Sequence, residues 1–262
     1  MERFTVLDTI LDCHVEGQGQ PLLLVHGFPL DHTIWEQQVR VLSDQYQVLA
    51  PDLRGFGGSL RGTAPFTIQQ FAADLSDLVQ QIVGLQPVAF CGLSMGGYIA
   101  WEFYRACREQ VSHLILCGTK AQRDASSTAR ARRLLARSVK HNGVSELAQS
   151  MSRRLVSTEW RQAQPDAFQS LQDCIQRARP QSVVDALGAM AERSDATELL
   201  ATIECPALVI VGEQDIITTV DEMKSVASRI KRGEWVTIPH AGHLAPLENP
   251  DSVNRALRAF LN

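Results

Sequence analysis

One short segment, Gly92-Leu93-Ser94-Met95-Gly96-Gly97, constrains the fold of this chain more than any other. It directly follows the apolar run Val88 to Cys91, which has the length of a buried strand, and it directly precedes the helical pattern of Tyr98 to Cys107. A serine flanked by glycines between a strand and a helix predicts a sharp, strained turn, because glycine lets the backbone close without Cβ clashes. The segment therefore predicts an α/β fold that exposes Ser94 as a candidate nucleophile.

The rest of the chain alternates strand-length apolar runs with amphipathic segments. Phe4 to Val15 is typical of two antiparallel strands around a turn. Six further strands are predicted at Leu22 to Val25, Gln47 to Ala50, Val88 to Cys91, Leu114 to Cys117, Ala207 to Val211 and Trp235 to Ile238. The clearest helix begins at Thr67, a plausible N-cap. We therefore expect a mostly parallel eight-stranded sheet with an antiparallel edge, flanked by helices.

Residues 119–195 differ from the rest of the chain. They contain no strand-length apolar run, and they carry 13 Lys and Arg against 8 Asp and Glu. This predicts a helical cap inserted after the sixth strand, with residues 1–118 and 196–262 forming the core. Both ends of the insertion leave the carboxyl edge of the sheet, so we expect it to lie over the edge that carries Ser94.

A serine hydroxyl needs a base within hydrogen-bond reach and a carboxylate that orients the base. Gly212-Glu213-Gln214-Asp215 follows one predicted strand, and Pro239-His240-Ala241-Gly242-His243 follows another. Both segments lie at carboxyl ends of strands, where open α/β sheets collect their active sites. Asp215 and His243 are the candidate acid and base, with Glu213 and His240 as competitors. The N–H of Met95, at the start of the next helix, can meet a developing oxyanion.

Several further motifs occur in a fixed order along the chain. They are His26-Gly27-Phe28-Pro29, Asp52-Leu53-Arg54-Gly55-Phe56-Gly57-Gly58-Ser59, the Ser94 turn, Val211-Gly212-Glu213-Gln214-Asp215, Ala241-Gly242-His243 and Glu248-Asn249-Pro250. With them the chain resembles the α/β-hydrolase superfamily over Pro21 to Leu261. Within it, the chain is most similar to the cap-bearing esterases, lactonases and cofactor-free haloperoxidase-like hydrolases, and most of all to 3-oxoadipate enol-lactonases.

The resemblance implies a role for each matching residue. Ser94 is the nucleophile, His243 the general base and Asp215 its orienting carboxylate. The backbone N–H groups of Phe28 and Met95 form the oxyanion hole, and no metal or cofactor is implied. Where such sequences usually have Thr-Pro, this chain has Thr218-Thr219, a departure that affects the loop after Asp215.

Other polar residues have structural interpretations. His26 is expected to hold the loop that carries Phe28, and Asp52 and Arg54 resemble the family's loop-stabilising pair. The sequence offers no partner for the remaining histidines, His14, His32, His113 and His141. Arginines of the insertion could meet an anionic substrate; they include Arg130, Arg132, Arg133, Arg153 and Arg154.

The expected function is hydrolysis of small carboxylic esters or lactones through an acyl-enzyme on Ser94. Carbon–carbon hydrolases, a lyase and perhydrolases with the same triad remain as alternatives, as does a catalytically silent ligand-binding protein. A net charge of −4 argues against nucleic-acid binding, and no apolar run is long enough to span a bilayer. Without an apolar leader, the protein is expected in the cytoplasm, with a small-molecule substrate. Its oligomeric state is left open.

Overall fold

The computed structural model describes residues 1–262, and a single eight-stranded sheet forms its centre. The strands are β1 (Glu2–Val6), β2 (Thr9–Glu16), β3 (Gln20–Val25), β4 (Tyr46–Pro51), β5 (Val88–Leu93), β6 (Val111–Cys117), β7 (Ala207–Gly212) and β8 (Gly233–Ile238). Their spatial order is β1-β2-β4-β3-β5-β6-β7-β8. The pairs β1–β2 and β2–β4 are antiparallel and all other pairs are parallel, which confirms the expected sheet.

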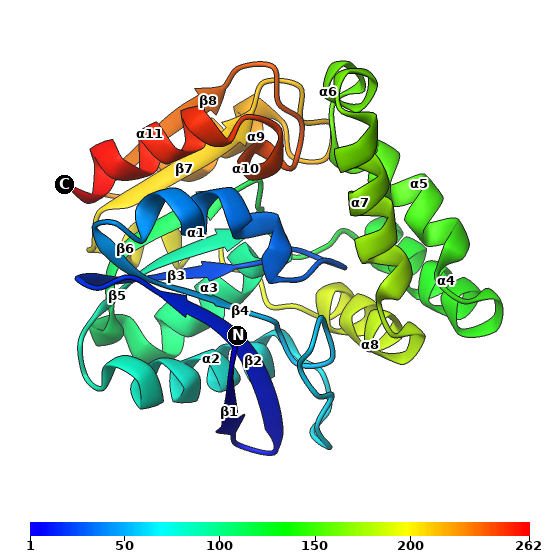
Figure 1. Cartoon of the computed structure of the whole chain (residues 1–262), viewed down its shortest axis with the longest axis horizontal. Helices are drawn as coiled ribbons and strands as arrows, with labels where there is room; N and C mark the ends of the chain where they lie inside the picture. The colour runs from blue at the N-terminus through cyan, green and yellow to red at the C-terminus, as the bar shows by residue number, and fades with distance from the viewer.

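Helices cover both faces of the sheet, as expected for parallel strands that are buried on both sides. They are α1 (Glu36–Leu42), α2 (Ile68–Val83), α3 (Met95–Cys107), α9 (Val220–Ser228), α10 (Ala245–Glu248) and α11 (Pro250–Leu261). The helices α1 and α11 pack together above the sheet in the view of Figure 1, and α2 and α3 pack together below it. The hydroxyl of Thr67 accepts a hydrogen bond from the N–H of Gln70 at 2.9 Å, so Thr67 is the N-cap predicted for α2. None of the helices combines the length and apolar composition required to cross a bilayer.

Helix α3 begins earlier than the sequence predicts. Its first residue is Met95, directly after Ser94, rather than Tyr98. Gly96 and Gly97 have low helix propensity, which is why the helical pattern in the sequence begins only after them. The close packing of the turn against β3 and β6 holds both glycines in the helix nonetheless, so tertiary contacts override local preference here.

Five helices fill the chain between β6 and β7. They are α4 (Ser126–Asn142), α5 (Ser145–Leu155), α6 (Thr158–Ala163), α7 (Pro165–Arg177) and α8 (Pro180–Ala191), and we call them the helical insertion. Helix α4 packs on α8, and α5 packs on α7. Figure 1 shows the insertion gathered at one side of the sheet, in green and yellow-green.

The two ends of the helical insertion are fastened to each other. The N–H of Ala196 donates to the carbonyl of Ala121 at 2.8 Å. The buried guanidinium of Arg193 pairs with Asp124 at 2.6 Å and donates to the carbonyl of Gln122 at 2.7 Å. These bonds close the base of the insertion where its chain leaves and re-enters the core.

The helical insertion also contacts loops at the carboxyl edge of the sheet. After β8, the N–H of Leu244 donates to the carbonyl of Leu155 at 3.0 Å, and Glu248 accepts from the N–H of Ser157 at 2.8 Å. After β4, Arg179 donates to the carbonyls of Gly55 and Ser59. The insertion is therefore bound to the loops that follow two different strands at this edge.

The loop after β4 is held by a fully buried ion pair. Arg54 donates hydrogen bonds to both carboxylate oxygens of Asp74 on α2, at 2.5 and 2.6 Å. It donates a third hydrogen bond to Asp8 at 2.8 Å. The side chains of Arg54 and Asp74 are 0% and 1% exposed. Removing one partner of such a pair leaves an uncompensated charge in the interior.

We expect Asp74→Asn to lower the free energy of unfolding by about 3–5 kcal/mol, because Arg54 keeps its charge but loses the buried counter-charge. Asp44→Asn is the matched control, since Asp44 pairs with Arg258 at 2.7 Å but is 55% exposed. Its loss should cost less than about 1 kcal/mol. Urea denaturation of both variants measures the difference, and equal losses would contradict the assigned role of the buried pair.

Candidate active site

Ser94 sits between β5 and α3 in a conformation that few side chains adopt. Its φ is 54° and its ψ is −108°, and it is the one partly exposed residue in the otherwise buried stretch from Val88 to Tyr104. A positive φ in a residue other than glycine is strained, and such strain collects at functional sites. The predicted turn is present and leaves Ser94 accessible.

The glycines on either side of Ser94 are required by close packing. A Cβ on Gly92 would overlap the carbonyl oxygen of Gly96, and a Cβ on Gly96 would overlap the carbonyl oxygen of Val25. The turn thus lies directly against the end of β3. This contact explains why the Ser94 turn needs glycine at both positions.

A buried acid–base pair lies beside this turn. Nδ1 of His243 is 2.8 Å from Oδ2 of Asp215, and the two side chains are 1% and 0% exposed. His243 comes from the loop after β8, and Asp215 comes from the loop after β7. The sequence-predicted acid and base are therefore brought together, although 28 positions separate them along the chain.

The end of β6 connects Ser94 to His243. The carbonyl of Cys117 accepts from the N–H of Ser94 at 2.8 Å, and the hydroxyl of Thr119 donates to the carbonyl of Ser94 at 2.8 Å. Gly118, between them, lies so close to the imidazole that a Cβ would be 3.0 Å from Cε1 and Nδ1 of His243. Ser94 and His243 thus flank the same three residues.

The carboxylate of Asp215 is held in its charged form. Burial opposes ionisation, but the charge and hydrogen bond of His243 and the hydrogen bonds from Thr218 outweigh it and lower the pKa of Asp215. The N–H groups of Ile217 and Thr218 donate to Oδ1 at 2.7 and 3.0 Å. A charged Asp215 can fix the imidazole with Nδ1–H toward the carboxylate, which leaves Nε2 free to accept a proton.

The two competing residues lie outside this arrangement. The side chain of His240 is 71% exposed, and its Nδ1 is 3.4 Å from Glu159 of the helical insertion. Glu213 is exposed and accepts from the N–H of His240 at 3.2 Å. Neither residue contacts the buried pair of Asp215 and His243.

The loop of Phe28 and the start of α3 at Met95 both adjoin Ser94. Met95 is the first residue of α3, so its N–H has no acceptor within the helix. The loop of Phe28 lies against the nucleophile, because a Cβ on Gly27 would be 3.2 Å from Cβ of Ser94. No backbone hydrogen bond of the loops uses the N–H of Phe28. The side chains of Phe28 and Met95 are 4% and 0% exposed.

His26 holds the loop of Phe28 rather than facing Ser94. Its Nδ1 donates to the carbonyl of Gly27 at 2.9 Å, and its Nε2 accepts from the N–H of Leu53 at 3.0 Å. Burial lowers its pKa, which fits a neutral ring with one donor and one acceptor nitrogen. This geometry agrees with the structural role predicted for His26.

In the neighbouring loops, Asp52, Arg54 and His32 have partners that the sequence does not predict. Asp52 and Arg54 do not pair with each other, since Arg54 binds Asp74 and Asp8 while Asp52 binds His32. His32, for which the sequence offers no partner, has Nδ1 2.7 Å from Oδ1 of Asp52. Burial opposes the charge on His32, but the bond and charge of Asp52 outweigh it and raise its pKa.

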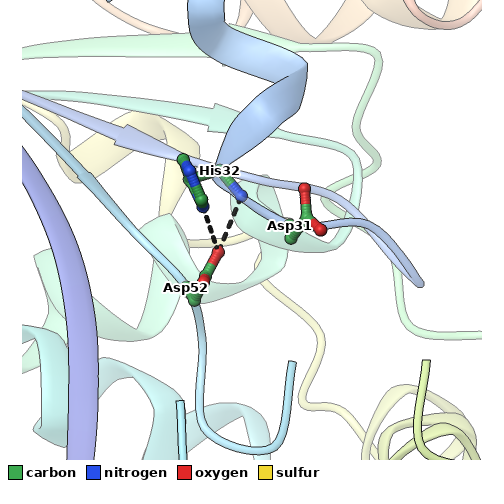
Figure 2. Close-up of side chains that lie close together, drawn as sticks. All are labelled: Asp31, His32 and Asp52. Carbon is green, nitrogen blue, oxygen red and sulfur yellow. Dashed lines mark hydrogen bonds and ion pairs between the residues drawn. The ribbon is translucent and has the colours of Figure 1, made fainter. Parts of the chain in front are cut away.

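Figure 2 shows this His32–Asp52 pair with Asp31 beside it. The three side chains offer ligand atoms within 4.8 Å of one another, the spacing of a candidate metal site. However, Asp52 already accepts hydrogen bonds from the backbone N–H of Gly58 and from the backbone N–H and ring Nδ1 of His32. Asp31 accepts from the backbone N–H of Thr33. A cation would have to displace these donors. The donor set therefore fits a network that orders the loop after Phe28 better than it fits a metal centre.

A cavity of about 480 Å³ lies between these loops and the helical insertion. Its lining includes Pro29, His32 and Gly57 from the core, and Arg177 and Arg179 from the junction of α7 and α8. Arg179 is bound to two carbonyls of the core, whereas Arg177 makes no such bond. The arginines singled out in the sequence lie elsewhere: Arg132 pairs with Asp124 at 2.6 Å, Arg133 lies 3.9 Å from Glu192, and Arg130, Arg153 and Arg154 are exposed.

Comparison with known proteins places the whole chain in one group. A model of the alpha/beta hydrolase family matches residues 22–256. The chain is 26% identical to 3-oxoadipate enol-lactonase 2 of Acinetobacter baylyi over 99% of its own length and 96% of that protein. A thermophilic esterase from Thermogutta terrifontis, solved with malate bound, is 38% identical, with a TM-score of 0.96 over 100% of this chain and 98% of that one.

The enol-lactonase from Burkholderia xenovorans is 25% identical, with a TM-score of 0.91 over 99% of both chains. The sheet order, the strained serine turn and the buried Asp–His pair thus occur in a chain that aligns from end to end with esterases and enol-lactonases. The protein therefore belongs to the alpha/beta hydrolase family, as a hydrolase with esterase and lactonase relatives.

Proposed function

We propose that the protein hydrolyses small carboxylic esters or lactones through a covalent acyl-enzyme on Ser94. The observation that carries this proposal is the buried pair of Asp215 and His243 beside an accessible serine with a positive φ. A serine with an oriented imidazole is the minimum that acyl transfer requires. The relatives named as esterases and enol-lactonases support the same reaction class.

The reaction proceeds in two steps with balanced proton transfers. In the first, Nε2 of His243 takes the hydroxyl proton of Ser94 as Oγ attacks the carbonyl carbon, and the N–H groups of Phe28 and Met95 bind the oxyanion. Collapse expels the alcohol, which receives that proton. In the second step, His243 takes a proton from water, hydroxide attacks the acyl carbon, and Ser94 Oγ leaves with the proton. A lactone gives one hydroxy acid instead of two products.

We further propose that the helical insertion, residues 119–195, acts as a cap domain that selects the acyl group. Its bonds to the loops after β4 and β8, which leave the same edge of the sheet as the turn of Ser94, support this proposal. The cavity at this boundary is lined by Pro29, which follows Phe28 in the chain, and by Arg177. This arrangement supports a preference for substrates that carry a second, free carboxylate, and Arg177 is the arginine of the insertion that would meet it.

The test compares paired p-nitrophenyl esters whose acyl groups end in a carboxylate or in its methyl ester. We expect the anionic ester to have the higher kcat/KM at low salt and its advantage to shrink at high salt, because the attraction is electrostatic. Arg177→Gln should reduce the preference several-fold. Arg153→Gln is the matched control, since this exposed arginine of α5 does not line the cavity.

Equal or better hydrolysis of the neutral ester at low salt would refute the anionic-substrate proposal and leave the esterase proposal intact. Hydrolysis of neither ester, nor of any member of a lactone panel, by a folded protein would refute the esterase proposal itself.

A further inference from the structure

Asp215 receives a hydrogen bond that the triad does not require. The hydroxyl of Thr218 lies 2.5 Å from Oδ2 of Asp215, the oxygen that also faces Nδ1 of His243. The same hydroxyl is 3.4 Å from Nδ1. Thr218 is only 1% exposed. One carboxylate oxygen is thus shared by the imidazole and by a buried hydroxyl.

The shared bond can be removed without breaking the others. Oδ1 of Asp215 accepts from the backbone N–H groups of Ile217 and Thr218, and these bonds survive any change of side chain at position 218. A hydroxyl can donate only one hydrogen bond. Because Oγ1 of Thr218 lies 2.5 Å from Oδ2 of Asp215, this bond goes to the carboxylate and not to the imidazole. The hydroxyl therefore acts on His243 only through Asp215.

The position of Thr218 is fixed from both sides. Thr219 begins α9 with a capping box, in which its hydroxyl accepts from the N–H of Glu222 and its own N–H donates to the side chain of Glu222 at 2.8 Å. Proline, which the resembling sequences usually have there, lacks the N–H for the second bond. On the other side lies Gly118, where a Cβ would be 3.3 Å from the hydroxyl of Thr218. The capping box thus holds the backbone next to Thr218, and the hydroxyl of Thr218 lies near Gly118.

We propose that Thr218 is a positioning residue that tunes His243 through Asp215. Its hydroxyl draws charge from Oδ2, so the carboxylate stabilises the imidazolium less and the ring gives up its proton at lower pH. The neutral ring that must accept the Ser94 proton is then populated over a wider range of pH. This inference rests on the proposed serine-hydrolase function.

The charged groups near His243 are few. Asp215 faces the ring from the loop after β7. Glu248 of α10 reaches the backbone next to it, where a Cβ on Gly242 would be 3.1 Å from Oε1, and burial raises the pKa of this carboxyl. His240 points to Glu159 instead. Because Thr218 does not contact Glu248 in this arrangement, a change at position 218 acts on the Asp215 side alone.

The experiment measures the rate at which a fluorophosphonate probe labels Ser94 as a function of pH, together with kcat/KM for p-nitrophenyl acetate. In both pH profiles, Thr218→Val should move the rise on the acidic side to a higher pH by about half to one pH unit. At pH values below this rise, the rate should fall about three- to tenfold. At the high-pH plateau the loss should be smaller. Thr218→Ser keeps the hydroxyl and should follow the unchanged protein. Thr202→Val removes an exposed hydroxyl whose bond is to the carbonyl of Leu199, and it serves as the control.

Thr218→Ala and Thr218→Ser form a second pair, because they differ by one oxygen atom and avoid the bulk of valine. If activity rose at the same pH in the alanine and serine variants, the role of Thr218 would be overturned. A loss of rate of the same size at every pH would also overturn it. Failure of the unchanged protein to be labelled at Ser94 would instead overturn the serine-hydrolase proposal and this inference with it.

Discussion

Replacing Ser94 by alanine should lower kcat for ester hydrolysis by about 10³-fold or more while the protein stays folded. Alanine retains the Cβ, so the backbone strain of the turn is unchanged and only the attacking oxygen is lost. The remaining members of the triad cannot compensate, because they act on the serine proton as a unit. Steady-state turnover and labelling by a fluorophosphonate probe together measure the loss.

Ser225→Ala is the matched control, because Ser225 is exposed on α9 and far from the turn in sequence. It should leave turnover and labelling within experimental error of the unchanged protein. Near-ultraviolet circular dichroism of both variants checks the fold. Substantial turnover in a folded Ser94→Ala protein would remove Ser94 from the nucleophile role.

Changing His243 to alanine should cause a comparable loss, again about 10³-fold or more, because the serine loses the group that takes its proton. His240→Ala should change turnover less than about threefold, since His240 is exposed and turned toward Glu159. The pair makes a direct comparison of two histidines three positions apart. If His240→Ala were the damaging change, the base would have to be reassigned.

The pH profile of the unchanged protein checks the same assignment. His243 must be neutral to accept a proton, so activity should rise with pH as its imidazole deprotonates. Asp215 should not add a second transition to this rise. Its pKa is held below the usual range of a carboxyl, so Asp215 is already charged at the pH where the imidazole deprotonates. A plot of activity against pH that rises in two separate transitions on its acidic side would contradict this assignment.

Much of the architecture could be predicted from the sequence, because its signals are local. Buried parallel strands are short apolar runs, and all six predicted in this way are present within three residues of their observed bounds. The order of serine, acid and histidine along the chain, together with their places at strand ends, was enough to select Asp215 and His243. The start of α3 was predicted three residues late, because Gly96 and Gly97 form helix only under tertiary packing.

What the sequence did not predict are contacts between loops that are distant along the chain. His32 and Asp52 are 20 positions apart and belong to different loops, so neither carries a local signal of the other. The junction of α7 and α8 is bonded to the core through Arg179, and Arg177 lines the cavity beside it, whereas the arginine clusters visible in the sequence lie elsewhere. Thr218 was visible only as part of a dipeptide that departs from the usual one. Its bond to Asp215 could have been suspected from their spacing of three residues.

The closed base of the helical insertion has a consequence for how such proteins change. The chain leaves the core at Ala121 and re-enters it at Ala196, and one hydrogen bond joins these two residues. An ion pair between Arg193 and Asp124 stabilises the same junction. Strands β6 and β7, which lie on either side of this junction in the chain, pair directly with each other in the sheet. We therefore expect that a different set of helices can be joined to the core at this junction while the sheet, whose loops carry Ser94, Asp215 and His243, keeps its strand order.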